Sequence, residues 1–259
     1  MTEKIQDTDD VKSEFVALVS HQLRTPLSAI RWYSEMLMSG DAGELNDKQK
    51  KLVKEIYRGT KRMVELISAL LDVSRIELGT FAVEPEETDL AEIAASSISE
   101  LSPAILEKGL EISQQYDPGV PHVYMDPRHA RIILQNLLTN AAKYTPTGGK
   151  ISVHISKAEP DNVKIEIADT GYGIPTDAQD KVFTKLFRAN NIKAKDTTGS
   201  GLGLYLVKQI MLHNGGEISF SSVLDQGTTF TILLPLQTKA PVRKGAPLSS
   251  FENPTEALS

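Results

Sequence analysis

The amino-acid sequence predicts an α-helical hairpin followed by an α/β sandwich. Within residues 1–79, apolar side chains recur every three or four positions, as they do in a helix with one buried face. After residue 150, short segments alternate apolar and polar side chains, which is the period of a β-strand. The acidic segment EPEETD, residues 84–89, separates the two patterns. We therefore expect a hairpin at 1–79, an α/β domain at 80–236 and a polar, disordered tail at 237–259.

The hairpin is predicted from two apolar stripes and the turn between them. The turn SGDAGELN, residues 39–46, contains two glycines, and Gly79 marks the end of the second helix. One hairpin cannot bury both stripes, whereas two hairpins can pair into a four-helix bundle, so we expect a homodimer. The first stripe comprises Val11, Phe15, Leu18, Val19, Leu23, Leu27, Ile30 and Leu37, and the second comprises Leu52, Ile56, Met63, Ile67 and Leu70.

The α/β domain is predicted from the order of its segments. Helical patterns occupy about 89–107, 127–144 and 201–213. Strand patterns occupy 151–156 and 163–168, joined by a hairpin connection, and a last strand pair occupies 217–222 and 228–235. The order of helix, strands, helix, hairpin, helix and hairpin favours a mixed sheet with helices on one face.

The composition excludes several classes of function. A net charge of −6 over 259 residues argues against non-specific binding to nucleic acid or to anionic membranes. The absence of cysteine excludes disulfides, zinc-thiolate sites and thiol catalysis. No apolar run approaches the ~18 residues that span a bilayer, and no signal peptide opens the chain. We expect a cytoplasmic segment without membrane contact, although a longer parent protein could be membrane-anchored.

Four polar residues share one face of the helix predicted at 127–144. Asn136, Asn140, Lys143 and Tyr144 fall within an arc of about 100°. Carboxamide oxygens are ligands that Mg²⁺ accepts together with water and phosphate, and a lysine can neutralise phosphate. The polar face of an ordinary amphipathic helix explains the same pattern equally well. His129 lies on the same polar face, one or two turns earlier.

A second segment, ADTGYGIP at 168–175, follows a predicted strand. Asp169 at the strand end can accept a hydrogen bond from an exocyclic amine such as that of adenine. Gly171 and Gly173 would let the backbone approach a flat ring closely. An ordinary Asp-Gly turn is an equally good reading of this segment alone.

A third segment, TTGSGLGLYLV at 197–207, places Gly199, Gly201 and Gly203 before an apolar helix. Free N–H groups at such a helix start attract phosphate, but the spacing is neither the dinucleotide fingerprint nor a P-loop. The preceding polar stretch carries cationic side chains and is either a mobile lid or a plain surface loop. Its cationic residues are Arg188, Lys193 and Lys195.

Together and in this order, the three segments resemble the N, G1 and G2 boxes of the Bergerat-type ATP-binding fold of histidine kinases. DNA gyrase, the heat-shock 90 chaperones and mismatch-repair ATPases share that fold. VFTKLFR, residues 182–188, resembles its F box. The resemblance covers about 80–236 and implies ATP and Mg²⁺ as cofactors.

The resemblance also implies a role for each matching residue. Asn140, supported by Asn136, would bind magnesium, and Lys143 and Arg188 would contact phosphates. The remaining residues implied at the nucleotide are Tyr144 and Thr228 near the base, Asp169 at the adenine amino group, Gly171 and Gly173 at the pocket floor, and Gly199, Gly201, Leu202 and Gly203 around the phosphates.

The segment SHQLRTPLSAI at 20–30 resembles the H box of sensor histidine kinases. On a helical wheel, His21 lies about 160° from the middle of the apolar stripe, and Thr25 shares its face. The resemblance implies that His21 takes the γ-phosphoryl group of ATP and passes it to an aspartate of a response regulator receiver domain. That domain must belong to another chain, because the sequence shows none. Thr25, one turn later, would orient water for dephosphorylating the regulator.

Gln22 departs from the common His-Glu-Leu-Arg-Thr-Pro form of this box. A carboxamide cannot act as a base at neutral pH, so it can only accept a hydrogen bond through its oxygen. Imidazole attack remains feasible, because a pKa of ~6.5 leaves most histidine neutral at pH 7. Pro26 removes one helical hydrogen bond and predicts a bend just after His21.

Two competing interpretations remain open from the sequence. One is an ATPase or protein-serine kinase of the same nucleotide-binding superfamily, which would not need a hairpin that carries a histidine. The other is a dimeric scaffold that binds ATP without transferring phosphate, which the complete set of asparagines, lysine and glycines argues against.

Overall fold

The computed structural model of this protein describes the backbone of residues 2–77, 84–189 and 199–236. Side chains are described for the same residues except 2–17, 20, 21 and 77. The chain divides into two compact units between Phe81 and Ala82. The tail expected at 237–259 and the lid lysines Lys193 and Lys195 lie outside the described residues.

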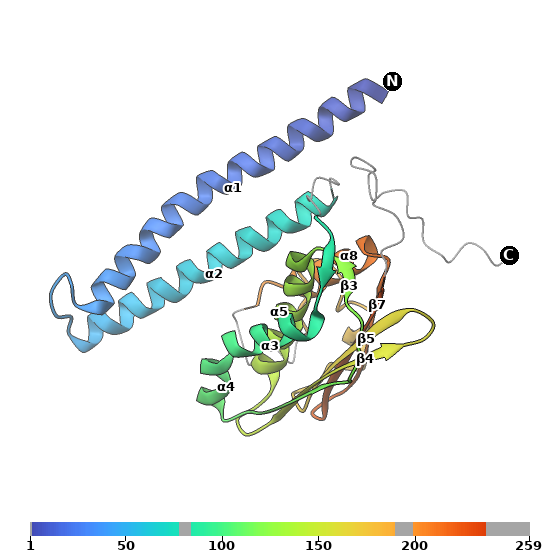
Figure 1. Ribbon diagram of the computed structural model, residues 1–259. Helices are drawn as coiled ribbons and strands as arrows, with labels where there is room; N and C mark the ends of the chain where they lie inside the picture. The colour runs from blue at the N-terminus through green and yellow to red at the C-terminus, as the bar shows by residue number, and fades with distance from the viewer. Residues whose placement is uncertain (1, 78–83, 190–198, 237–259) are drawn as a thin grey trace. The chain divides into compact units, whose positions relative to one another are not determined.

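The first unit is the expected helical hairpin, drawn in blue and cyan in Figure 1. Helix α1 (Thr2–Ser39) packs along α2 (Asp47–Glu77). Gly40 and Gly43 adopt φ values of 91° and 102° in the turn, a region that glycine enters without steric cost. Asn46 and Gln49 then exchange side chain–backbone hydrogen bonds of 2.9 Å, a reciprocal cap that starts α2.

The single hairpin leaves much of its apolar surface exposed. Leu27 of α1 and Val53 and Leu71 of α2 are buried between the helices. By contrast, Leu52 and Ile56 remain 58% and 52% exposed. The other large exposed apolar residues of the two helices are Leu18, Leu23, Ile30, Trp32, Tyr33, Met38, Met63, Leu66 and Leu70.

The second unit is built on a five-stranded mixed sheet in the order β2-β4-β5-β7-β6. Strand β2 (Glu111–Tyr116) pairs parallel to β4 (Lys150–Ala158), and all other neighbours are antiparallel. The other strands of this sheet are β5 (Asn162–Asp169), β6 (Glu217–Val223) and β7 (Gly227–Pro235). A separate two-stranded sheet pairs β1 (Glu86–Thr88) with β3 (Val123–Met125).

Helices cover one face of the five-stranded sheet (Figure 1). They are α3 (Leu90–Glu100), α4 (Ser102–Lys108), α5 (Pro127–Tyr144) and α8 (Gly203–His213), with a short α6 (Thr176–Gln179) beyond β5. The core lies between α5 and the inward residues of β4, β5 and β7. Its largest fully buried side chains include Ile133, Leu134, Leu137, Leu138, Ile155, Ile165, Ile167 and Ile232.

The predicted α/β sandwich is confirmed, with one correction to its helices. The single helix expected at 89–107 is two helices, which divide at Leu101. Pro103 lies in the first turn of α4, where its missing N–H costs nothing, but it could not continue α3 because its ring would clash with the carbonyl four residues earlier.

Candidate functional site

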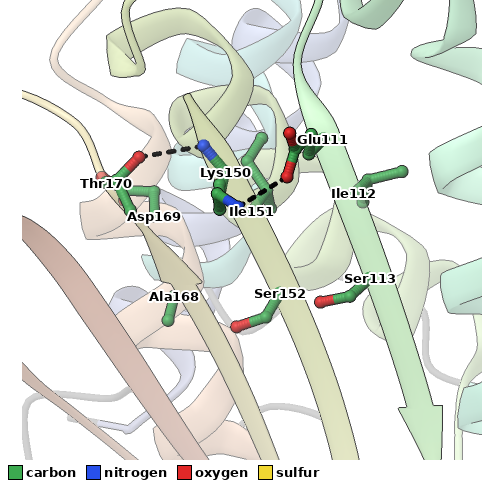
Figure 2. A pocket seen from close by; sticks show the side chains of 9 residues that line it. All are labelled: Glu111, Ile112, Ser113, Lys150, Ile151, Ser152, Ala168, Asp169 and Thr170. Atoms are coloured by element: carbon green, nitrogen blue, oxygen red, sulfur yellow. Dashed lines mark hydrogen bonds and ion pairs between the residues drawn. The ribbon is translucent and has the colours of Figure 1, made fainter. Parts of the chain in front are cut away.

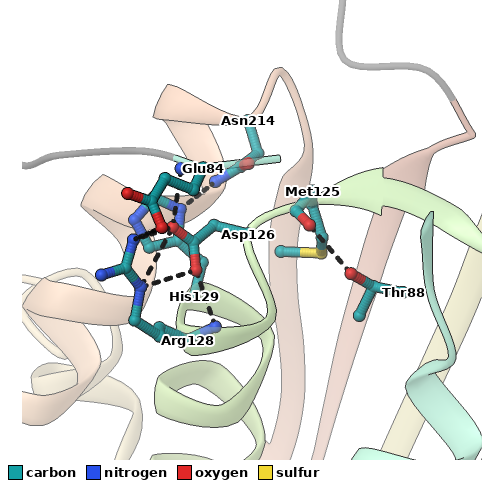
Figure 3. Close-up of polar contacts among 7 residues, drawn as sticks. All are labelled: Glu84, Thr88, Met125, Asp126, Arg128, His129 and Asn214. Atoms are coloured by element: carbon teal, nitrogen blue, oxygen red, sulfur yellow. Dashed lines mark hydrogen bonds and ion pairs between the residues drawn. The ribbon is translucent and has the colours of Figure 1, made fainter. Parts of the chain in front are cut away.

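Helix α5 carries four of the predicted site residues, and its start is fixed by Asp126. The Asp126 carboxylate is buried and accepts hydrogen bonds from the backbone N–H groups of Arg128 and Glu84, each at 2.9 Å (Figure 3). The Arg128 guanidinium also donates to it at 2.6 Å. These hydrogen bonds hold the pKa of Asp126 at about 2, against the opposing effect of burial.

His129, one turn into α5, is not on the polar face that the helical pattern indicates. Its side chain is 1% exposed, and its Nδ1 lies 3.2 Å from Nδ2 of Asn214 (Figure 3). Burial lowers the pKa of His129 to about 4, so the imidazole is neutral at pH 7. Packing of α8 against α5 therefore gives this histidine a structural role.

The polar face of α5 begins with Asn136, whose side chain is held by a hydrogen bond to the helix backbone. Asn136 donates from Nδ2 to the carbonyl of Ile132 at 2.8 Å, which directs its Oδ1 away from the helix axis. Asn140, Lys143 and Tyr144 are half-buried on the same side. The opposite face packs into the core through Leu134, Leu137 and Leu138.

Lys108 caps the C-terminal end of α5. Its Nζ donates to the carbonyls of Ala142, Lys143 and Thr145 at 2.8, 2.7 and 3.1 Å. An ammonium group has three hydrogens, so this end cap uses all of them. Burial lowers the pKa of Lys108. Sequence reasoning missed this residue, because nothing in the local pattern of 102–108 points to a helix that follows 19 residues later.

The triple-glycine turn lies directly against the end of α5. A Cβ placed on Gly199 would lie 3.1 Å from Nζ of Lys143, 3.3 Å from the hydroxyl of Tyr144 and 3.4 Å from Nε of Arg188. The lysine ammonium also lies 5.2 Å from the centroid of the Tyr144 ring. Three residues from two predicted motifs therefore meet at Gly199, where a Cβ would crowd all three side chains.

The rest of this turn approaches Asn136. A Cβ on Gly203 would collide with Oδ1 of Asn136. Gly201 has a φ of 71°, and a Cβ there would lie 2.7 Å from the carbonyl carbon of Leu186. Leu202 is buried and anchors the turn at the start of α8. The turn therefore lies against the polar face of α5 and leads into the start of α8, where the N–H of Leu202 donates to Oγ of Ser200 at 3.2 Å.

Asp169 lies at the end of β5 with its carboxylate turned into the same region. It accepts hydrogen bonds from the backbone N–H of Gly171 at 2.8 Å and from the backbone N–H of Thr228. Burial raises the pKa of Asp169 to about 6, and these two hydrogen bonds oppose the rise. A Cβ on Gly171 would lie 2.6 Å from the carbonyl oxygen of Tyr144, so the loop after β5 also meets α5.

Thr228 and Gly173 lie at the end of this region where the resemblance places the base. Thr228 pairs directly with Asp169 across β5 and β7 and is 7% exposed. Gly173 has a φ of 62°, and a Cβ there would collide with the carbonyl of Val223. The loop that begins at Asp169 is therefore in close contact with β6.

Ser222 and Gln179 are two further residues of this region that sequence reasoning missed. Ser222 pairs with Thr228 across β6 and β7, and Gln179 donates to the carbonyls of Ile174 and Ser222 at 3.0 and 3.1 Å. A signal for Ser222 was present, because the alternation of EISFSS puts this serine on the same face as Ile218 and Phe220.

A pocket of about 480 Å³ opens beside the same strand end, between β2, β4 and β5. Figure 2 shows Ser113 and Ser152 directed into it from neighbouring strands, with the ion pair of Lys150 and Glu111 at its rim. Among the described residues predicted to bind nucleotide, only Asp169 lines it. The predicted set therefore gathers elsewhere, between α5, the glycine turn and the ends of β5 and β7.

The predicted phosphoacceptor residues lie in α1. His21 is within this helix, but its side chain lies outside the described ones, so its predicted exposure is untested. Gln22, Thr25 and Pro26 are exposed, and Leu27 is buried against α2. Pro26 interrupts the hydrogen bonding of a helix that otherwise continues to Ser39.

Two regions of the chain match known protein families. Residues 125–238 match the family of histidine kinase-, DNA gyrase B- and HSP90-like ATPases. Residues 11–79 match the His Kinase A (phospho-acceptor) domain. Within the described part of the chain, no helix is long and apolar enough to cross a membrane.

Similar proteins carry both regions in the same order. The chain is 34% identical over 235 residues to the circadian input-output histidine kinase CikA of Synechococcus elongatus, covering 90% of this chain and 31% of that protein. It is 31% identical to the adaptive-response sensory kinase SasA of a Synechococcus species, covering 90% of this chain and 62% of that protein. The chain therefore spans only part of the length of these relatives.

The solved structure of full-length ShkA in complex with AMPPNP is similar across most of the chain. It matches with a TM-score of 0.72 and 26% identity, over 91% of this chain and 47% of that one. The matched 91% of the chain includes residues of the hairpin and residues of the α/β unit.

Proposed function

We propose that this chain, which belongs to the sensor histidine kinases and comprises their catalytic core, phosphorylates His21 from ATP. We propose further that it passes the phosphoryl group to an aspartate of a separate response regulator. Residues 1–79 act as the dimerisation and phosphoacceptor domain, and residues 80–236 act as the ATP-binding domain. The observation that supports this most strongly is the meeting of Gly199 with Lys143, Tyr144 and Arg188.

ATP binds between α5, the glycine turn and the ends of β5 and β7. Asp169 accepts a hydrogen bond from the adenine amino group, and Tyr144 and Thr228 lie near the base. Lys143 and Arg188 offset phosphate charge. The backbone N–H groups from Gly199 to Gly203 donate to phosphate oxygens, and the N–H of Leu202 exchanges its 3.2 Å contact with Oγ of Ser200 for a phosphate oxygen. The solved complex of ShkA with AMPPNP, an ATP analogue, supports nucleotide binding by this fold.

Mg²⁺ fits this site only in company with the nucleotide. The described residues include no group of three histidine, aspartate or glutamate side chains that could hold a metal ion alone. The carboxamide oxygens of Asn140 and Asn136 would hold the ion together with phosphate oxygens and water, which is the mixed ligand set that magnesium prefers. When bound, magnesium neutralises charge on the phosphates.

In the transfer step, a neutral nitrogen of His21 attacks the γ-phosphorus of ATP in line with the leaving oxygen. A P–N bond forms, the bond between the γ-phosphorus and the bridging oxygen breaks, and ADP leaves. The imidazole then loses its remaining N–H proton to restore neutrality. Gln22 can orient that N–H through its carboxamide oxygen, but the proton must pass to water or to another base.

Phosphatase activity toward the regulator is part of the same proposal. Thr25 lies one helical turn after His21 and is at the helix surface, where its hydroxyl can orient an attacking water. This role does not require the acidic residue that the common form of the H box has at this position, so Gln22 leaves it intact. If Thr25→Ala leaves dephosphorylation of the regulator unchanged, the role is wrong.

The homodimer is supported by the exposed apolar stripe of α2. Leu52, Ile56, Met63, Leu66 and Leu70 recur at spacings of four, seven, three and four residues, the repeat of a coiled-coil seam. A second hairpin that covers this stripe forms the four-helix bundle.

The decisive test is incubation of the chain with γ-labelled ATP and Mg²⁺. Label that is acid-labile and base-stable, and that is lost in His21→Gln, supports the proposal. Asn140→Ala serves as a nucleotide-site control and should lose the label while His21 is intact. Acid-stable label retained in His21→Gln would favour a serine kinase, and nucleotide binding without any label would favour a scaffold.

A further inference from the structure

Three residues form a row across the strands at the base end of the proposed nucleotide site. Asp169 of β5 pairs with Thr228 of β7, and Thr228 pairs with Ser222 of β6. The hydroxyl oxygens of Ser222 and Thr228 lie 2.8 Å apart. Ser222 therefore touches Thr228 from the side opposite to Asp169.

The Ser222 hydroxyl has three neighbours, and their chemistry determines where its proton points. The backbone N–H of Ile174, 2.8 Å from Ser222 Oγ, can only donate, whereas the carbonyl of Gly227, at 3.0 Å, can only accept. A hydroxyl carries one hydrogen and two lone pairs. Only one assignment makes all three contacts hydrogen bonds: the Ser222 proton goes to Gly227, and the two lone pairs of its oxygen accept from Ile174 and from the Thr228 hydroxyl.

This assignment leaves Thr228 without a hydrogen for a ligand. Its one hydroxyl proton points to Ser222, so its oxygen offers only lone pairs on the side of the nucleotide. Asp169, when ionised, is also an acceptor without a hydrogen. These two neighbouring acceptors can both accept hydrogen bonds from an amino group of the ligand. They disfavour a carbonyl oxygen at the same place, because an acceptor that faces another acceptor finds no donor for its lone pairs.

We propose that Ser222 is a positioning residue that fixes the direction of the Thr228 O–H bond and so makes the site select 6-amino over 6-keto purine nucleotides. This inference rests on the proposed nucleotide site. Ser222 itself does not touch the base; it acts through Thr228.

A variant at Gln179 can distinguish orientation of the Thr228 hydroxyl from simple support of the loop after β5. Its amide nitrogen joins the carbonyls of Ile174 and Ser222, so it ties the same loop to β6 without touching either hydroxyl. Loss of Gln179 loosens the loop but leaves the direction of the Thr228 proton unchanged. Loss of the Ser222 hydroxyl frees that proton.

The test compares ADP with IDP, which carries a carbonyl in place of the amino group at position 6. Dissociation constants are measured by titration calorimetry on the full chain. We expect Ser222→Ala to lower the preference for ADP about tenfold, because the freed Thr228 hydroxyl can donate to the carbonyl of IDP. Ser222→Thr, which keeps the hydroxyl, should retain the preference of the wild-type chain for ADP. Gln179→Leu weakens both nucleotides and leaves their ratio unchanged.

Ser221→Ala is the matched control, because it removes the same group from the exposed face of the same strand. It should change neither constant. If Ser222→Ala does not fold, as judged by thermal unfolding, Ser222→Cys takes its place, since a thiol is a weak hydrogen-bonding group.

Three results overturn the inference while the nucleotide site stands. They are an unchanged preference in a folded Ser222 variant, an equal loss of preference in Gln179→Leu, and a wild-type chain that binds ADP and IDP equally well. Failure of the wild-type chain to bind ADP at all would instead overturn the proposed function, and this inference with it.

Discussion

Asp169 combines burial with a proposed role that requires charge. Burial raises its pKa to about 6, so the free protein takes up a proton at mildly acidic pH. In the proposed complex, an adenine amino group donates to the ionised carboxylate, so nucleotide binding is expected to favour the ionised form and to release a proton near that pH. The affinity for ADP should therefore fall as the pH falls through the pKa of this residue.

The expected fall in ADP affinity between pH 7.5 and pH 5 is about tenfold, which follows from a free pKa of about 6. Calorimetry in two buffers of different ionisation enthalpy would measure both the affinity and the released proton. Asp169→Asn should bind ADP weakly and without this pH dependence. A wild-type affinity that does not change over the range would show that Asp169 does not accept from the base.

Gln22 is the second residue whose chemistry leads to a prediction. Gln22→Glu supplies a carboxylate next to His21 that can take the imidazole proton, so autophosphorylation should accelerate by up to about 10²-fold, the lower end of general-base effects. Initial rates with γ-labelled ATP measure this. Ala29→Glu is the control for charge alone, because this exposed position lies two helical turns beyond Gln22. A flat or lower rate for Gln22→Glu would show that the carboxamide oxygen suffices.

Helix α5 depends on a lysine that comes from another part of the chain. Lys108→Met would leave the carbonyls of Ala142, Lys143 and Thr145 without their shared donor. We expect the free energy of unfolding of the α/β unit to fall by about 1–3 kcal/mol, and ATP binding to weaken as Lys143 loses its fixed place. Chemical denaturation and calorimetry measure the two effects. Lys157→Met, at an exposed position of β4, should change neither quantity.

Helix α1 is predicted to bend at Pro26. Pro26→Ala restores an N–H donor to the carbonyl of Gln22 and should straighten and stabilise the helix by up to about 3 kcal/mol. If the bend sets how His21 meets the ATP-binding domain and the response regulator, the ratio of kinase to phosphatase rates should change in an intact receptor that contains this chain. Rates of both reactions that equal those of the wild type would contradict a role of the bend in signalling.

At the scale of the whole molecule, we propose that a second copy of the chain covers the exposed apolar stripe of α2. Ile56→Glu places a charge in the exposed stripe of α2 and should convert a dimer into a monomer at micromolar concentration, because burial of an unpaired carboxylate is costly. Light scattering after gel filtration measures the mass. Leu106→Glu, at a leucine of the α/β unit that is 79% exposed, should leave the mass unchanged. A dimer that survives Ile56→Glu would place the interface elsewhere.

Much of the architecture could be predicted from local pattern. The apolar repeat predicts α1 and α2, and the alternation of 151–156 and 163–168 predicts β4 and β5. The glycine spacing of 199–203 predicts a turn before α8. Each of these depends on residues within one or two helical turns or strand periods, so a single segment of sequence contains the information.

The same pattern misplaced His129 and missed the break at Leu101. A helical wheel puts His129 on a polar face, but α8 packs over that face and buries it. The apolar pattern of 89–107 continues through the break, although Pro103 forces it. In both cases the helical repeat of apolar residues is overridden by an interaction that it does not report. For His129 this interaction is the packing of α8, and for the break at Leu101 it is the clash of the Pro103 ring.

By itself, the sequence determined the two units, the family and the residue types that can bind a nucleotide, because motif spacing and periodicity are local properties of the chain. Only the tertiary structure decided which side chains hold those residues in place. Lys108 reaches α5 from 34 to 37 positions away, and Ser222 reaches Ile174 from 48. Such contacts depend on how strands and helices pack, since hydrogen bonds join groups that are close in space whatever their distance along the chain.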